Sequence, residues 1–414
     1  MKRFAAACAM ALGLWTPGAG NGPATTSDFE RELARLDVAI VAAGGPASGA
    51  ATAAERAAAI AELADRRAAL TGNALDLERA SVALNNALKL VGPIEELLLL
   101  DAELKLRTHR VHEAAQLLET LPEPADAQRV ATLRADIDVQ EGDYASARRA
   151  YESLVKSDPS WDRIARLAWL ESILGDPDRA DALYASAQEL LTVKEMRQFA
   201  GLELQRGQLE FRRGRFKAAQ AHYERADGAY SGYWMTQDYM AELLAARAEL
   251  RQSVELYERL LATSARPAAE QAIGDVYALQ GDATRSRAHH ERALAGYLES
   301  VRRGETQYFH HLAAYYADVA MDGAEAVRWA RKDLELRTGY ASRDALAWAL
   351  FRNGEIERAR EQIELALAPG IRDAHVLFHA AMIDLAAGRG DEGRRLLREA
   401  SAVNPQFASF HVHR

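Results

Sequence analysis

The chain has 414 residues, of which 49% are hydrophobic and 27% are charged. This composition is that of a folded protein with room for a large core, and it excludes an intrinsically disordered chain. The 51 Lys and Arg are outnumbered by 60 Asp and Glu, which gives a formal net charge of −9. An acidic balance argues against nucleic acid as a partner, because phosphate binding needs clustered basic side chains.

Residues 1–24 have the pattern of a secretory signal peptide. Two basic residues precede an apolar run over residues 4–15, and small and helix-breaking residues follow that run. The run is too short to span a bilayer, which takes roughly 20 residues. We therefore expect an exported protein, periplasmic or secreted, with cleavage after Gly20 or Ala24. No later apolar stretch reaches membrane-spanning length.

The only cysteine, Cys8, lies inside this predicted leader. The residues before it do not match a lipoprotein signal, so we do not expect lipidation. Cleavage would leave a chain without cysteine, which excludes a disulfide, a thiol nucleophile and a cysteine-ligated zinc. Removing two of the 51 basic residues and none of the 60 acidic ones would take the formal net charge to −11.

The next part, residues 25–54, is expected to hold one helix and a linker. The stretch over residues 28–44 is amphipathic, and Ser27 precedes it as an N-cap. Small residues then dominate residues 44–52. This part would be either an N-terminal cap on the following domain or a mobile lead-in.

A repeat of about 34 residues follows. Gly-Asp turns are each preceded, seven residues earlier, by a small residue. The turn positions are 109, 142, 175, 214, 248, 281, 321, 354 and 388, with steps of 33, 33, 39, 34, 33, 40, 33 and 34. The small residues are Ala102, Ala135, Ala168, Gly207, Ala241, Gly274, Ala314, Ala347 and Ala381. A degenerate tenth unit, with Ala68, Ala80, Leu84 and Ala87 in register, precedes them.

The spacing has a physical explanation. Two helices of about 14 residues and a tight turn repeat every ~34 residues. A small side chain is needed where the two helices cross closely, and Gly provides the left-handed conformation that ends the first helix. The steps of 39 and 40 predict longer helices or loops around residues 190–200 and 296–307.

This pattern resembles the tetratricopeptide repeat. The match is good in one late unit, with Leu346, Ala347, Gly354, Ala359, Ile363 and Ala366, and the last unit keeps Ala381, Gly388, Gly393, Leu397, Ala400 and Pro405. Two units depart from it, because Ala248 and Met321 replace the turn glycine. The resemblance implies an all-α fold, a right-handed α-solenoid of about nine to ten repeats over residues 55–407, followed by a tail at 408–414.

Motifs for catalysis are missing from the sequence, and we expect neither an enzyme nor a cofactor. The segment Gly388–Gly393 fits G-x-G-x-x-G, but it falls in a turn between helices rather than after a β-strand. His375 and His379 are four residues apart on one predicted helix face. Two ligands are too few for a tight metal site, and the sequence places no carboxylate beside them, so no metal ligand is assigned.

The resemblance also implies which side chains face the concave groove. They lie six and three positions before the small residue, and one, four and sometimes five after it. In the last three repeats these are Tyr308, His311, Tyr315, Asp318, Asp344, Trp348, Phe351, Arg352, His375, Phe378, Met382 and Leu385. Weaker candidates upstream are Trp169, Ser172, Leu204, Gln208, Phe211, Arg212, Asp238, Glu242 and Asp275. Alternatively, tight curvature or the C-terminal tail, with Phe407 and Phe410, buries the aromatic residues.

These features favour a non-catalytic interaction scaffold or assembly factor in the bacterial periplasm. Its partner would be a protein or peptide bound in the groove, and an acidic middle beside an aromatic end suits a basic, partly apolar peptide. The alternative is an accessory protein that binds a metal or small ligand through the C-terminal histidines. The sequence leaves the partner's identity and the oligomeric state open.

Overall fold

The computed structural model describes residues 26–45, 52–121 and 126–407. The predicted signal peptide, the middle of the small-residue linker and Phe410 lie outside these ranges. In the described ranges the regular secondary structure is helical throughout. The helices are α1 (Asp28–Gly44), α2 (Ala53–Thr71), α3 (Ala74–Val91), α4 (Glu95–Arg107), α5 (Val111–Glu119), α6 (Ala127–Glu141), α7 (Tyr144–Ser157), α8 (Trp161–Ile173), α9 (Pro177–Glu189), α10 (Met196–Arg212), α11 (Phe216–Ala229), α12 (Trp234–Ala246), α13 (Leu250–Thr263), α14 (Pro267–Leu279), α15 (Ala283–Arg302), α16 (Phe309–Ala314), a π-helical segment (Tyr315–Val319), α17 (Gly323–Leu336), α18 (Tyr340–Arg352), α19 (Ile356–Leu367), α20 (Ala374–Ala386) and α21 (Gly390–Val403).

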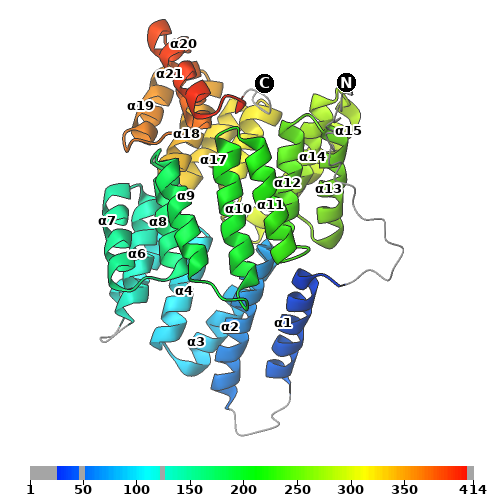
Figure 1. Ribbon diagram of the computed structural model, residues 1–414, viewed down its shortest axis with the longest axis vertical. Helices are drawn as coiled ribbons and strands as arrows, with labels where there is room; N and C mark the ends of the chain where they lie inside the picture. The colour runs from blue at the N-terminus through cyan, green and yellow to red at the C-terminus, as the bar shows by residue number, and fades with distance from the viewer. Residues whose placement is uncertain (1–25, 46–51, 122–125, 408–414) are drawn as a thin grey trace, which may run out of the picture.

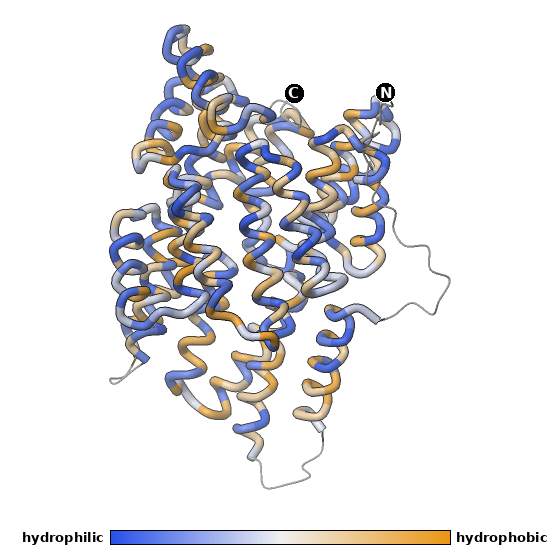
Figure 2. The backbone as a smooth tube through the Cα atoms, in the orientation of Figure 1, coloured by the Kyte–Doolittle hydropathy of each residue, from blue (hydrophilic) through white to orange (hydrophobic). Residues whose placement is uncertain are grey.

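Successive helices from α2 onwards pack as antiparallel pairs, α2 with α3 through to α20 with α21. The pairs stand side by side along a coil, and hydrophobic and hydrophilic stretches alternate along most helices (Figures 1 and 2). The predicted all-α solenoid of helical hairpins is therefore confirmed. Of the longer helix or loop predicted around residues 296–307, the structure has the longer helix, because α15 has 20 residues. No helix in the described ranges is long and apolar enough to cross a membrane.

The backbone is left-handed at each of the nine predicted turn positions. Six of them are glycines, with φ between 70° and 88°, and the degenerate first turn has Gly72 at 57°. His109, Ala248 and Met321 adopt the same conformation at φ of 63°, 61° and 56°. An L-residue there costs about 1–2 kcal/mol, so the hairpin geometry is maintained even where glycine is absent.

The small residues lie where the two helices of a pair cross. Gly207 shows why: a Cβ atom there would lie 2.3 Å from Cε1 of Tyr223, a fully buried ring on α11. At Gly274 the Cβ would lie 2.2 Å from Cδ2 of His290. His290 takes the position that Tyr151, Tyr184, Tyr223 and Tyr257 occupy in the preceding repeats.

One predicted crossing residue, Ala314, is wrong by one position. The N–H of Ala320 donates to the carbonyl of Tyr315, five residues back, so this helix ends in a π-helical turn. A π turn holds one residue more than an α turn, which shifts the register of everything before it. Ala313, 1% exposed, therefore lies at the crossing, and Ala314 is turned towards the inside of the coil.

Helix α1 matches the helix predicted for residues 28–44. Ser27 caps it with a reciprocal capping box to Glu30. The helix packs against α2, and its first residues contact the loop between α11 and α12. There, Ser231 donates its backbone N–H and its hydroxyl to the carboxylate of Asp28 at 3.0 and 2.7 Å.

Successive turns of the coil touch each other. The turn within each early hairpin contacts the loop that lies between two later hairpins. The N–H groups of Thr338 and Gly339 donate to the carbonyl of Gln140 at 3.0 and 2.8 Å, for example, and Arg372 N–H donates to the carbonyl of Ile173 at 3.2 Å. Equivalent pairs, 191–198 residues apart in sequence, are Asn73 with Ser264, Arg266 with Thr71, Thr306 with Thr108 and Tyr340 with Tyr144.

These contacts define the pitch of the coil. The hairpin α2–α3 contacts the loop between α13 and α14, and α2 to α13 comprise six helical pairs. One turn thus takes about six repeats, and the hairpins from α14 to α21 stack on the first turn (Figure 1). The pitch of the coil is small enough for backbone groups of adjacent turns to form hydrogen bonds with each other.

The crossing constraint predicts opposite effects for two glycines of the same helix, α10. Gly207→Ala should lower the midpoint of thermal unfolding, because displacing the buried Tyr223 ring costs about 1–3 kcal/mol. Gly201 has open space around its Cα, so Gly201→Ala should raise the midpoint through a helix propensity gain of about 1 kcal/mol. Equal shifts in the two variants, measured by circular dichroism, would contradict the proposed crossing.

The contact between turns predicts a local effect of removing one hydroxyl. Tyr144 Oη accepts a hydrogen bond at 2.8 Å from the N–H of Tyr340, one coil turn away. Tyr144→Phe should cost about 1 kcal/mol and accelerate hydrogen exchange of the Tyr340 amide, measured by mass spectrometry. Tyr297→Phe is the control, because that hydroxyl bonds Gln271 within the same turn. Unchanged exchange at Tyr340 in Tyr144→Phe would show that the turns do not touch in solution.

Candidate binding channel

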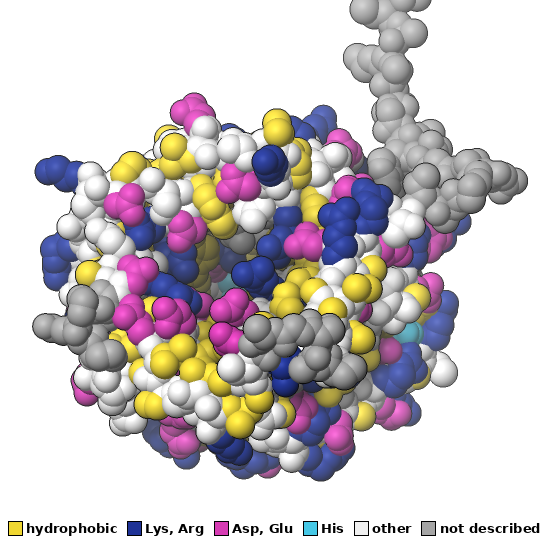
Figure 3. Space-filling model, turned by 90° about the horizontal axis from the view of Figure 1, so that it is seen from below, with side chains coloured by type: hydrophobic (Ala, Val, Ile, Leu, Met, Phe, Trp, Pro, Cys, Tyr) yellow, Lys and Arg dark blue, Asp and Glu magenta, His cyan; other side chains and the backbone are white. Residues whose placement is uncertain are grey.

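Two cavities occupy the inside of the coil, with volumes of about 700 and 680 Å³. They adjoin, because Trp169, Tyr184 and Gln205 line both, and together they are called the central channel below. Seen from below, the surface is hollowed near its middle, with both acidic and basic side chains around the hollow (Figure 3). The first helix of each repeat therefore faces an interior space.

The side chains that line the central channel follow the inward register expected from the sequence. In α10 these are Gln208, Phe211 and Arg212, one, four and five residues after Gly207. The same offsets give Ala69, Glu103, Leu106, Arg107, Asp136, Val139, Gln140, Trp169, Ser172, Glu242 and Ala246 in the neighbouring repeats. The middle repeats, which the sequence ranked as weaker candidates, thus supply most of the channel wall.

Ion pairs between consecutive first helices cover one part of this wall. Arg107 of α4 bonds Asp65 of α2, and Arg129 of α6 bonds Glu103 of α4 with a distance of 2.8 Å from Nε to Oε1. Arg166 of α8 continues the series to Asp136 of α6 at 3.0 Å. Each charge in this ladder has an opposite charge on the next repeat. Three successive helix contacts are therefore linked electrostatically, and the charges of the wall are balanced in pairs.

A second part of the wall is acidic. Glu242 of α12 lines the channel, and Asp238 precedes it by four residues on the same helix. Burial raises the pKa of Glu242 to about 7, with the nearby Asp238 adding to the effect, and burial raises the pKa of Asp238 to about 6. Near neutral pH these two groups together carry fewer than two negative charges, and they can take up or release a proton when the surroundings change.

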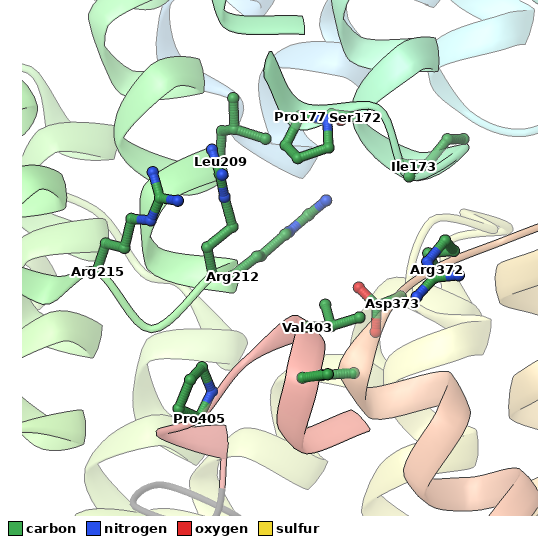
Figure 4. Close-up of a pocket in the computed structure, with 14 residues that line it drawn as sticks. Ser172, Ile173, Pro177, Leu209, Arg212, Arg215, Arg372, Asp373, Val403 and Pro405 are labelled. Atoms are coloured by element: carbon green, nitrogen blue, oxygen red, sulfur yellow. The ribbon is translucent and has the colours of Figure 1, made fainter. Parts of the chain in front are cut away.

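Arg212 faces this acidic part from α10. Burial disfavours its charged form, but Tyr340 and Asp373 keep its pKa above the ordinary value. Its side chain and that of Asp373 also point into a cavity of about 320 Å³ at the contact between coil turns, where Arg213, Arg215 and Arg372 gather (Figure 4). The cationic Arg212 therefore lies at the place where the central channel adjoins the contact between coil turns.

The predicted groove residues of α18 and α20 are mostly packed. Trp348 is 6% exposed: its ring stacks on Phe351 at 4.9 Å and its Nε1 donates to Asp318 at 2.9 Å. Phe378 contacts Phe407 of the C-terminal segment at 5.8 Å between ring centroids. Phe407, which the sequence analysis named as a residue that could cover these rings, thus contacts Phe378, whereas Trp348 is covered by Phe351 and His379.

The other predicted groove residues do not form one surface, because they pack in different parts of the structure. Tyr315 is 5% exposed and packs edge-on against His290, because the π turn directs it away from the channel. Tyr308 and His311 stack around Tyr297, and burial lowers the pKa of His311 to about 4. Arg352 bonds the carbonyl of Ala317 at 2.9 Å.

The last four predicted residues lie on α18 and α20. Leu385 packs against Gly393 of α21, where a Cβ atom would lie 2.6 Å from its Cγ. Met382 packs against the C-terminal core. His375 alone of the predicted set lines the central channel, while Asp344 is buried beside His379.

Some channel residues escaped the sequence prediction. Tyr184 belongs to a second helix, α9, and Phe216 to α11, whereas only first helices were expected to face inwards. Tyr184 was visible in the sequence as the aromatic residue nine positions after Gly175, and Tyr151, nine positions after Gly142, also lines the channel; both are largely buried by packing, so only part of each ring can face inwards. Asn404, Gln406 and Phe407 close one end of the channel from the last described segment, which no repeat pattern could indicate.

The raised pKa of Glu242 predicts how stability depends on pH. A carboxyl whose folded pKa exceeds its unfolded value destabilises the fold as pH rises from about 4.5 through about 7. Glu242→Gln should therefore raise the unfolding midpoint more at pH 8 than at pH 5, measured by differential scanning calorimetry. The matched control, the exposed Glu255→Gln, should change the midpoint little and equally at both values. An equal gain for Glu242→Gln at pH 5 and pH 8 would contradict its burial as a carboxylate.

Comparisons with known proteins identify no family and give only distant structural likenesses. No family model and no curated protein matches the chain. Among solved structures, the chain is similar to MamA (20% identity, TM-score 0.33, covering 41% of this chain and 96% of that one). It is also similar to a tetratricopeptide repeat protein from Parabacteroides merdae (16%, 0.36, 59% and 93%) and to the APC/C hetero-tetramer Cut9–Hcn1 (14%, 0.42, 92% and 80%). At these identities the likeness concerns the fold alone.

Proposed function

We propose that this protein is a non-catalytic interaction protein that binds a segment of another polypeptide in the central channel. The observation that carries the proposal is the channel itself, which is formed where the first helices of successive repeats face one another. One of its two cavities has a volume of about 700 Å³, which falls within the ~300–1,000 Å³ typical of ligand sites in proteins.

The chemistry of the wall supports a peptide as the occupant. Trp169, Phe211 and Tyr239 offer apolar surface, and Gln205 and Gln208 offer amide groups that can pair with an extended backbone. Arg212 adds a positively charged group, and Glu242 adds a carboxyl group that can be neutral or negatively charged. A partly apolar segment with a basic residue fits this wall, because a cation beside Glu242 would favour its ionised form.

We further infer that the protein acts in the bacterial periplasm as a scaffold or assembly factor. The signal-peptide pattern of residues 1–24 supports this location. A small molecule is the second candidate occupant, since the channel volume suits one equally well.

Photo-crosslinking from inside the channel tests the proposal. With p-benzoylphenylalanine in place of Trp169, a large aromatic residue that lines both cavities, we expect adducts with one or a few polypeptides in the native envelope fraction, seen as shifted bands and identified by mass spectrometry. The matched control carries the same group at Gln252, which is exposed on α13. Polypeptide adducts equally abundant at both positions, or present only at Gln252, would contradict channel binding, and a small-molecule adduct at position 169 would favour the second candidate.

A plug variant provides the complementary test. With the crosslinker at position 169, Gln208→Trp should fill the channel and abolish capture of the crosslinked polypeptide, whereas Gln252→Trp should leave capture unchanged. Circular dichroism would show that both variants keep their helices. Full capture by a folded Gln208→Trp protein would exclude the channel as the binding site.

A further inference from the structure

We propose that Asp344, His375 and His379 form a binding site for a divalent transition-metal ion, with Zn²⁺ as the expected occupant. The two histidines come from α20 and the aspartate from α18, so the site joins the first helices of two consecutive repeats. One ligand atom from each of the three side chains lies within 4.8 Å of the other two. In the described part of the chain, no other trio of His, Cys, Asp and Glu side chains comes this close.

The distances are near those that a metal requires. Nδ1 of His379 lies 2.9 Å from Oδ1 of Asp344, and the rings of His375 and His379 are 4.3 Å apart between centroids. Zinc bonds of ~2.0–2.1 Å place two ligands of a tetrahedral site roughly 3.3 Å apart. Binding therefore needs no pair of ligand atoms to close by more than about 1.5 Å, which side-chain rotation of His375 can supply, and it needs the His379–Asp344 pair to open by about 0.4 Å.

The donor set selects the class of metal. Two imidazoles and one carboxylate suit Zn²⁺ and neighbouring first-row ions, whereas Ca²⁺ and Mg²⁺ prefer all-oxygen sites. His379 is 3% and Asp344 7% exposed, but His375 borders the central channel. Three protein ligands leave a fourth position for water or a ligand side chain, and His375 places the site at the wall of the central channel.

Neighbouring side chains hold the cluster in place. The indole of Trp348 stacks on His379 with centroids 4.1 Å apart and planes inclined by 12°. Trp348 is itself held by the hydrogen bond from its Nε1 to Asp318. A ring clamped in this way keeps its nitrogens aimed at one point, which is how the surroundings of a metal site usually orient histidine ligands.

A purely structural histidine–carboxylate pair is the competing explanation, and the chain offers comparisons. His290 bonds Asp275 at 2.8 Å, and His222 bonds Glu203 at 2.7 Å, where Arg225 and Gln188 also bond the carboxylate. In each of these pairs only one imidazole is within reach of the carboxylate. Asp344 differs because a second imidazole, four residues along the same helix, completes a trio. The pair His290–Asp275 is therefore a suitable internal control.

Isothermal titration calorimetry of the full chain with Zn²⁺ tests the site. His411 and His413, in the C-terminal tail, are replaced by Ala in every protein used, so that they cannot contribute ligands. We expect one equivalent of Zn²⁺ per chain. His375→Ala and Asp344→Asn should each weaken binding by more than about tenfold, the loss found even for groups that only orient a ligand. Asp344→Asn keeps a hydrogen-bond acceptor for His379 and guards against misfolding.

The control and a spectrum decide between the two explanations. His290→Asn should bind Zn²⁺ as tightly as the parent protein. Titration with Co²⁺ should give visible absorption bands of a four- or five-coordinate N/O site in the parent and not in His375→Ala. The absence of stoichiometric Zn²⁺ binding by the parent, or equal affinity in folded His375→Ala, would overturn the proposal.

Discussion

The whole molecule depends on the close crossing of two helices within each repeat. Helices approach closely only where neither presents a bulky side chain at the crossing. At Gly207 and Gly274 even one extra methyl group would overlap the aromatic ring of the partner helix. Because the same crossing recurs about every 34 residues, each hairpin is turned by a similar amount relative to the one before. The sum of these small rotations is a coil of about six hairpins per turn whose successive turns meet.

The contact between coil turns determines whether the inner surface is an open groove or a channel. An open superhelix exposes a groove to solvent, whereas this coil encloses a space bounded by α2, α4, α6, α8 and α10 and by parts of α12, α16 and α20. Charged side chains that would be fully solvated in a groove are partly desolvated here: those of Arg166 and Asp136 are 36% and 21% exposed. Ion pairs along the wall, Arg166 with Asp136 and Arg107 with Asp65, offset the free-energy cost of this desolvation. At Glu242 it shifts the pKa instead, so that the carboxyl is partly neutral near pH 7.

The inner side chains of the C-terminal repeats pack differently from those of the middle repeats. Their inner aromatic residues pack on each other and on Phe407, so this end of the coil is closed by its own side chains. Within that packing, Trp348 holds His379 beside Asp344. The end of the coil that offers little free surface to a polypeptide is thus the one that gathers metal-binding donor groups. A metal there and a peptide in the channel would meet at His375.

The sequence alone determined the repeat, because helix crossings and left-handed turns are local requirements that leave small residues and glycine at fixed spacing. The resemblance to the tetratricopeptide repeat predicted part of the inward register, since Gln208, Phe211 and Arg212 lie at its positions after Gly207. Leu204 and Asp275, predicted in the same way, instead pack in the core and bond His290, respectively. Tertiary structure decided the rest. The π turn after Ala314 moved Tyr315 out of the expected position, although nothing in the spacing marks the extra residue. The contact between Gln140 and Gly339, and the approach of Asp344 to His375 and His379, depend on angles between helices. Those angles come from the packing of whole side chains across repeats, which residue spacing does not encode.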